Sequence, residues 1–239
     1  MGRKLLNTII LVRHAECYKN IRDEHGGKGD VLTMKGKKQL LSLSKKIDQL
    51  NIKHQIPANM LFYSDVSQIM QTAEYLSIKL GVPAMLDERI APLNLGILDG
   101  LSKKEAMTKF PDEASQLEKW RSGMLEIRDL QIPCAESFDT FWNRGKSFIF
   151  ELTKNSTSAI VVGSRSVLIL LMNILLDQNP YVDGKYYPYN FSCASIAYFS
   201  YTNKWKSIYM RGVHTFDGKV LKVQNREEIP SGFFIHPKK

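Results

Sequence analysis

A short run of apolar residues near the N-terminus, residues 9–12, ends abruptly at Arg13 and His14. Such a run is typical of a buried parallel strand, and α/β proteins place their polar sites where those strands end. An imidazole in that position can attack phosphorus, while a neighbouring guanidinium holds two phosphoryl oxygens in a bidentate grip. The pair therefore predicts both a fold class and a phosphate-facing site.

The rest of the chain alternates between expected strands and expected helices. The strands are expected at residues 8–12, 60–63, 159–162, 195–200 and 205–210. The helices are expected from Thr33 to about residue 50, from Ser64 or Asp65 to residue 80, and over 102–110, 136–152 and 165–176, with mostly loop over 87–100. This alternation predicts an α/β fold, a three-layer α/β/α sandwich with a mostly parallel central sheet. We expect a single domain over residues 1–239.

The composition is that of an ordinary globular chain with a basic bias. The formal net charge is +9, which favours anionic partners such as a phosphorylated small molecule or an acidic protein face. The lysines are scattered, which is equally typical of a general basic surface. A nucleic-acid partner is not expected, because the sequence lacks basic stretches interleaved with aromatic residues.

The cysteines and apolar stretches bear on location and on metals. The three cysteines, Cys17, Cys134 and Cys193, have no metal-ligand spacing, so we expect no metal and a reducing compartment. The longest apolar run, residues 167–176, is too short to span a bilayer, and no secretory signal core precedes the first strand. We therefore expect a cytoplasmic protein.

For Cys17, near cationic groups, we favour a plain buried thiol over a redox-active one.

Several short motifs occur in a fixed order along the chain. They are residues 11–16 with Asn20, residues 30–33 with Gly36 and Gln39, residues 63–65 with 71–73, residues 95–96 with 99–101, and finally Asn190, Ser192 and His214. This ordered series resembles the histidine phosphatase superfamily, in its phosphoglycerate-mutase-like branch. The resemblance covers nearly the whole chain and implies that family's fold.

The resemblance also implies a mechanism with two histidines, two arginines and a carboxylic acid that protonates the leaving oxygen. Arg13 and His14 match the first arginine and the phosphorylated histidine. The other three positions differ from the family pattern. They are Gln68 in place of the second arginine, Pro92 in place of the acid and Ser164 in place of the second histidine.

These replacements remove charge and a proton donor from a reaction that depends on both. General acid catalysis alone contributes ~10²–10⁴-fold to a rate. We therefore expect a pseudophosphatase, with weak or lost phosphomonoesterase activity, that still binds a phosphorylated or anionic ligand. The alternative is an active phosphohydrolase or mutase that works through phospho-His14 with a relocated acid and relocated cations. The residues that could supply the positive charge from other positions are Lys19, Arg22, His25, Lys28 and Arg165. Glu88 could supply the proton.

The expected site follows from these matches. Arg13 and His14 are the expected catalytic residues, and no cofactor is expected. The residues expected to contact the ligand are Arg13, Glu16, Asn20, Gln68, Ser164 and Arg165.

Overall fold

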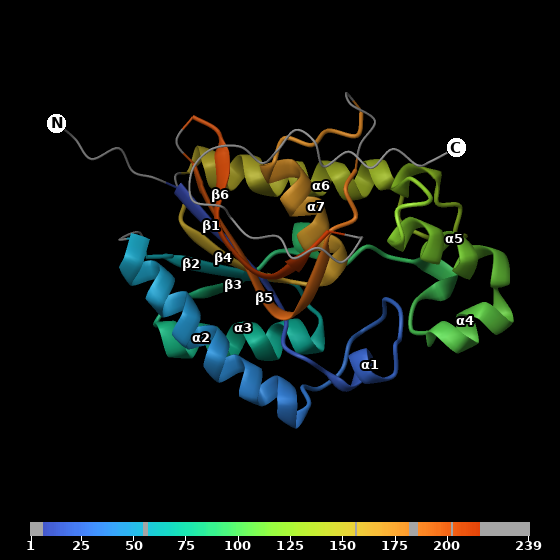
Figure 1. Cartoon of the computed structure of the whole chain (residues 1–239), viewed down its shortest axis with the longest axis horizontal. Coiled ribbons are helices and arrows are strands. Elements are labelled where there is room, and N and C mark those ends of the chain that lie inside the picture. The colour runs from blue at the N-terminus through green and yellow to red at the C-terminus, as the bar shows by residue number, and fades with distance from the viewer. Residues whose placement is uncertain (1–6, 55–56, 156, 182–185, 202, 216–239) are drawn as a thin grey trace.

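A computed structural model describes residues 7–54, 57–155, 157–181, 186–201 and 203–215. The central feature is a six-stranded sheet in the order β3-β2-β4-β1-β5-β6 (Figure 1). Its strands are β1 (Asn7–Arg13), β2 (Met60–Tyr63), β3 (Ala84–Leu86), β4 (Ala159–Gly163), β5 (Asn190–Tyr201) and β6 (Trp205–His214). The first four strands run parallel, and β5 and β6 add an antiparallel pair beside β1. The expected mostly parallel sheet is confirmed.

Helices cover both faces of this sheet, as Figure 1 shows. The helices are α1 (Tyr18–Ile21), α2 (Met34–His54), α3 (Ser67–Leu80), α4 (Lys103–Lys109), α5 (Pro111–Arg121), α6 (Phe138–Lys154) and α7 (Arg165–Leu175). Short 3-10 turns lie at η1 (Glu88–Ile90), η2 (Gly96–Leu98) and η3 (Ile127–Asp129). Helices α2 and α3 lie on one face and α6 and α7 on the other, while α4 and α5 project to one side. The expected three-layer sandwich is thereby confirmed.

The two faces of β1 explain why its sequence is apolar throughout. Successive side chains of a strand point to opposite faces, so Ile9 and Leu11 pack with α6 and α7 while Ile10 and Val12 pack with α2 and α3. All four residues are fully buried. The strand therefore anchors the residues at its carboxyl end, Arg13 and His14, in the middle of the molecule.

Most of the expected elements are found, with shifts at their ends. The Thr33 hydroxyl accepts a hydrogen bond from Gly36 N (2.9 Å) and caps α2 as expected, although α2 runs on to His54. Ser64 and Asp65 do not cap α3, because its N-cap is Val66, without a side-chain hydrogen bond. In the segment 87–100 the 3-10 turns η1 and η2 interrupt the expected loop.

Three elements besides the 3-10 turns were not expected from the sequence. Helix α1 has only four residues, none of them buried. Strand β3 has three residues, all apolar and all exposed, at the edge of the sheet, which is too short a run to show an alternating pattern. Helix α5 begins at Pro111, directly after the helix expected over 102–110. Pro is favourable at the first helical position, because the missing N–H has no intrahelical partner there. No helix among the described residues is long and apolar enough to cross a membrane.

Candidate functional site

The candidate site lies at the carboxyl ends of β1 and β4, where the two adjacent strands separate into loops. Arg13 pairs in register with Gly163, and the His14 amide donates to the Gly163 carbonyl at 3.2 Å. Ser164 and Arg165 follow at once at the start of α7. The fold therefore brings Arg13 and His14 next to the two site residues predicted from the distant segment 164–165.

His14 is held in an orientation suited to nucleophilic attack. Its side chain is 3% exposed, and its Nδ1 lies 2.8 Å from the Ala15 carbonyl. With the proton on Nδ1 donated to that carbonyl, Nε2 keeps its lone pair. Burial, the positive charge of Arg13 and, more weakly, that of Lys19 lower the pKa of His14 to about 3. The imidazole is therefore neutral near neutral pH.

The Arg13 side chain is held between strands, and some of its guanidinium N–H donors have no partner in the part of the chain that the structure describes. Its Nη1 donates to the carbonyl of Phe191 on β5. Its Nε is buried and has no hydrogen-bond partner among the described residues. Burial lowers the pKa of Arg13. A buried guanidinium with an unpaired donor favours an anionic ligand, because a buried polar group without a partner is costly.

Further cations gather around this pair. Burial, Arg121 and Arg13 lower the pKa of Arg165 to about 10, while Asp23 and Glu118 act against this shift. Arg165 makes no hydrogen bond or ion pair with a described side chain. The Arg121 Nη2 lies 3.2 Å from Nδ1 of the buried His25. Lys19 acts on His14 and is itself buried enough to have a lowered pKa. The cationic cluster is defined here as Arg13, Lys19, Arg121 and Arg165.

The position expected for the acid is occupied by Pro92, and its loop is braced by Arg144. The Arg144 guanidinium donates to the carbonyls of Arg89, Ala91 and Pro92 at 2.7, 2.7 and 3.1 Å. It also pairs with Glu136 at 2.7 Å. The charges that shift the pKa of His14 are both cationic, from Arg13 and Lys19. The site thus combines a positive cluster with a loop that offers no carboxyl group at position 92.

Ser164, in place of the second histidine, is the N-cap of α7 without a side-chain cap. Its hydroxyl lies 3.1 Å from that of Ser166, and Ser166 accepts from the Leu93 amide at 3.1 Å. The segments that carry Ser164 and Pro92 are therefore neighbours across this short contact.

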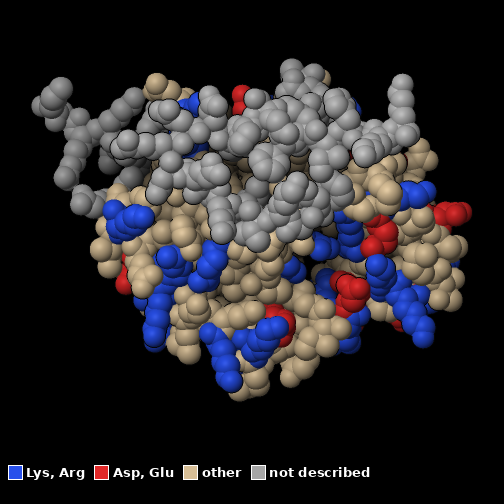
Figure 2. Space-filling model, viewed as in Figure 1, with Lys and Arg blue, Asp and Glu red and all other residues tan. Residues whose placement is uncertain are grey.

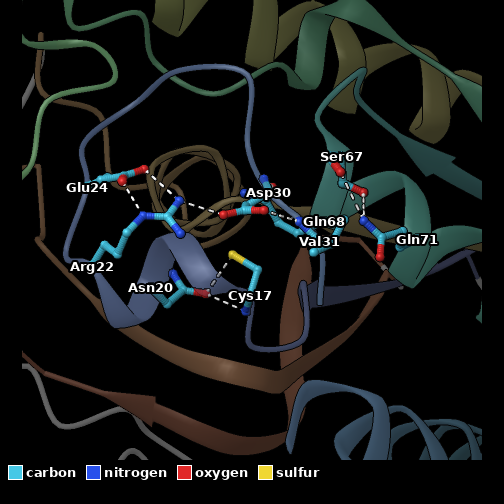
Figure 3. A network of polar contacts seen from close by, with 9 residues as sticks. All are labelled: Cys17, Asn20, Arg22, Glu24, Asp30, Val31, Ser67, Gln68 and Gln71. Carbon is cyan, nitrogen blue, oxygen red and sulfur yellow. Dashed lines mark hydrogen bonds and ion pairs between the residues drawn. The ribbon is translucent and has the colours of Figure 1, made fainter. Parts of the chain in front are cut away.

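Gln68, in place of the second arginine, is buried near the start of α3. Its Oε1 accepts from the Asp30 amide at 3.0 Å (Figure 3). A side chain on Gly29 would collide with this oxygen, since a Cβ there would lie 2.1 Å away. Gln68 therefore holds the loop that precedes α2, and its role toward a ligand stays a prediction.

The carboxylate of Glu16 and the amide of Asn20 are also engaged within the protein. Glu16 accepts from the Thr33 hydroxyl at 2.9 Å and from Lys35 at 2.8 Å. The Asn20 Oδ1 accepts from the amide and the thiol of Cys17, both at 3.1 Å. These contacts order the segment after His14, and direct contact of either residue with a ligand stays a prediction.

Two of the residues that could have replaced the family's cations or acid do not lie at the candidate site. Arg22 is half exposed and pairs with Glu24 and with Asp30, the latter at 2.5 Å (Figure 3). Glu88 is exposed on η1. Neither is part of the cationic cluster. Sequence reasoning missed Arg121 because it missed α5, and it missed Arg144 because the helical pattern of α6 gives no sign of which loop the side chain reaches.

The described residues contain no group of three or more histidine, cysteine, aspartate or glutamate side chains that could hold a metal ion. The site thus combines cations with the imidazole of His14, and at its edge Arg121 also pairs with Glu118 at 2.9 Å. Such a set can bind and polarise a phosphoryl group.

Comparison with known proteins agrees with this geometry. Residues 9–209 match the histidine phosphatase superfamily (branch 1), and the chain belongs to this family. A protein named probable phosphoglycerate mutase GpmB from Erwinia tasmaniensis is 27% identical over 172 residues, 70% of this chain and 74% of the relative. A GpmB of the same description from Escherichia coli K12 is 28% identical over 163 residues, 67% of each chain.

Solved structures show the same fold. The α-ribazole phosphatase of Shigella flexneri has a TM-score of 0.68 at 16% identity and covers 86% of this chain and 96% of its own. A mycobacterial glucosyl-3-phosphoglycerate phosphatase in complex with VO3 has a TM-score of 0.67 at 17% identity and covers 84% of this chain and 97% of its own. The expected phosphoglycerate-mutase-like architecture is confirmed.

Proposed function

We propose that this chain binds a phosphorylated or otherwise anionic small molecule against Arg13 and His14 and hydrolyses ordinary phosphomonoesters weakly or not at all. One observation carries the proposal: the positive charges of Arg13 and Lys19 act on a neutral His14, while position 92 holds a proline in a braced loop. Binding needs only the positive charges and uncommitted donors. Rapid cleavage of an ordinary ester also needs a proton for the leaving oxygen, and that step contributes ~10²–10⁴-fold.

Orthovanadate and inorganic phosphate are suitable probes, because they present the charge and shape of a phosphoryl group. Isothermal titration should detect vanadate binding to the wild-type chain and a Kd raised roughly 10- to 100-fold by Arg13→Ala, as expected for loss of a charge-assisted hydrogen bond of about 1.5–3 kcal/mol. Arg22→Ala is the matched control, since it removes the same charge from an exposed arginine outside the cluster. Equal weakening by both substitutions would show that binding depends only on net charge.

Turnover of para-nitrophenyl phosphate tests the second half of the proposal. We expect hydrolysis near the uncatalysed background, with His14→Ala changing it little. Turnover of ordinary enzymatic size that His14→Ala abolishes would refute the pseudophosphatase function.

A second candidate function is an active phosphohydrolase or mutase through phospho-His14. Lys19 and Arg165 favour it, as cations near the nucleophile pair in addition to Arg13. Asp99 would then be the displaced acid, because it is close to Lys19 and burial raises its pKa. Acid-labile labelling of His14 by a radioactive phosphodonor, with faster decay in wild type than in Asp99→Asn, would support this candidate.

A further inference from the structure

Two cysteine thiols from distant parts of the chain meet beside His14. Cys17 follows β1, and Cys193 lies on β5. Both point at the side-chain oxygen of Asn20, with Sγ to Oδ1 distances of 3.1 Å for Cys17 and 3.6 Å for Cys193. The two sulfur atoms can therefore be no farther apart than the sum of these distances. Both thiols are free.

We propose that Cys17 and Cys193 form a reversible disulfide when hydrogen peroxide reaches the site, with Cys193 as the thiol that reacts first and Cys17 as the one that resolves it. This modification site is independent of the proposed ligand and activity. Its chemistry rests on the shared Asn20 contact, on the different exposure of the two sulfurs, and on the backbone around Cys193.

The two cysteines differ in access to solvent. Cys17 is 0% exposed, so peroxide cannot reach it directly. Cys193 is half-buried and lines an open cavity of about 230 Å³, together with Gln39, Ser42 and Arg211. Because a thiol must be accessible to be oxidised, Cys193 is the entry point.

The backbone at Cys193 is irregular, which gives it room to move. The pairing of β5 with β6 shifts register between Phe191 and Ile196. Within this bulge Ala194 has φ +58, a left-handed conformation that is uncommon for a residue with a side chain. The Ala194 amide donates to the His14 carbonyl at 3.2 Å. The bulge interrupts the β5–β6 ladder around Cys193, and the proposal requires a local shift there that brings the sulfurs to the bonding distance of about 2.05 Å.

The reaction balances with peroxide as the only oxidant. The Cys193 sulfur attacks one oxygen of hydrogen peroxide, the O–O bond breaks, and Cys193 becomes a sulfenic acid while water leaves. The Cys17 sulfur then attacks the Cys193 sulfur, the S–O bond breaks, and the hydroxide departs as water with the Cys17 proton. Two thiols and one peroxide thus give one disulfide and two waters. Closure ends both thiol contacts with Asn20.

Peptide mapping of the full-length chain after peroxide treatment tests the proposal. We expect a linked pair of peptides that contain Cys17 and Cys193, loss of two of the three free thiols, and their recovery with dithiothreitol. Cys134 is the matched control, because it is exposed but has no partner thiol among the described residues. A link through Cys134, or oxidised Cys193 beside an intact Cys17 thiol, would overturn the proposal. So would the absence of reaction.

Single substitutions separate the two roles. In Cys17→Ser, the sulfenic acid at Cys193 should persist and be trapped by dimedone, then advance to sulfinic acid in excess peroxide. In Cys193→Ser, Cys17 should stay a thiol. If Cys17→Ser does not fold, Cys17→Ala repeats the test with a small apolar residue. Dimedone labelling of Cys193 that is equal in wild type and in the Cys17 variant would show that Cys17 does not resolve it.

Discussion

At the scale of single residues, His14 combines burial with a free nitrogen. Its surroundings keep the imidazole uncharged, since burial and two cations both oppose protonation. The same features have a thermodynamic consequence, because the unfolded chain has no such restraint. The pKa of His14 rises to its ordinary 6.5 on unfolding and is about 3 in the folded protein.

The stability of the protein should therefore fall in acid. Between pH 6.5 and about 3, His14 binds a proton in the unfolded state but not in the folded state. His14 alone therefore lowers the free energy of unfolding by about 1.4 kcal/mol for each unit by which the pH falls in this range. Urea unfolding at a series of pH values measures this slope. His14→Gln should reduce the slope, while His54→Gln, at a less buried histidine, should reduce it less. Identical slopes in all three proteins would contradict the assignment.

The sequence predicted Arg13 and His14 because both follow directly from the end of an apolar strand. It did not predict what Gln68 and Asn20 contact. Their partners, the Asp30 amide and the thiols of Cys17 and Cys193, depend on the path of the loop before α2 and on a bulge in β5. Neither the loop path nor the bulge leaves a periodic signal in the sequence.

At the scale of elements, the best predictions were those with local chemistry. The capping box of Ser102 and Glu105 begins α4, and the Ser137 hydroxyl caps α6, at the starts expected for the helices over 102–110 and 136–152. The elements that were not expected, α1, β3 and α5, are short or begin at a proline, which more often marks the end of a helix. A capping side chain acts within one turn of its own helix, whereas an exposed edge strand is fixed only by its neighbour.

Close contact between α2 and the segment after His14 predicts a difference between two helical glycines. A Cβ on Gly36 would lie 2.0 Å from the Glu16 carbonyl oxygen, a backbone atom, whereas one on Gly145 would meet the end of the Leu170 side chain at 2.6 Å. Gly36→Ala should therefore destabilise the protein by about 1–3 kcal/mol. In Gly145→Ala, the roughly 1 kcal/mol gain in helix propensity offsets the strain against Leu170. The free energy of unfolding should therefore change less than in Gly36→Ala. Urea midpoints with unchanged m-values would measure both, and equal midpoints would contradict this packing.

At the scale of the whole molecule, the fold is that of the family, as the match over residues 9–209 and the helical layers on both faces of the sheet indicate. That the catalytic set is incomplete, at residues 68, 92 and 164, stays a prediction. The surface shows abundant lysine and arginine side chains (Figure 2), in keeping with the net charge of +9. Electrostatic attraction of an anionic ligand is therefore available without the missing groups.

Restoring the missing groups together should restore catalysis. The triple variant Gln68→Arg, Pro92→Glu, Ser164→His should hydrolyse para-nitrophenyl phosphate at least about 10²-fold faster than wild type, because it regains a proton donor and positive charge. Adding His14→Ala to the triple variant should return turnover to background. The control is Gln68→Arg with Ser164→His alone, which lacks the acid. A triple variant that folds but stays at background would place the defect elsewhere in the site.

The brace formed by Arg144 has a consequence for how this site could change over time. Arg144 donates to carbonyl oxygens, which every amino acid has, so these three hydrogen bonds do not require a proline at position 92. Proline adds its own restriction on the backbone, so an exchange at this position would remove that restriction while leaving the acceptors of Arg144 in place. Chains that carry other residues here could therefore keep the same loop.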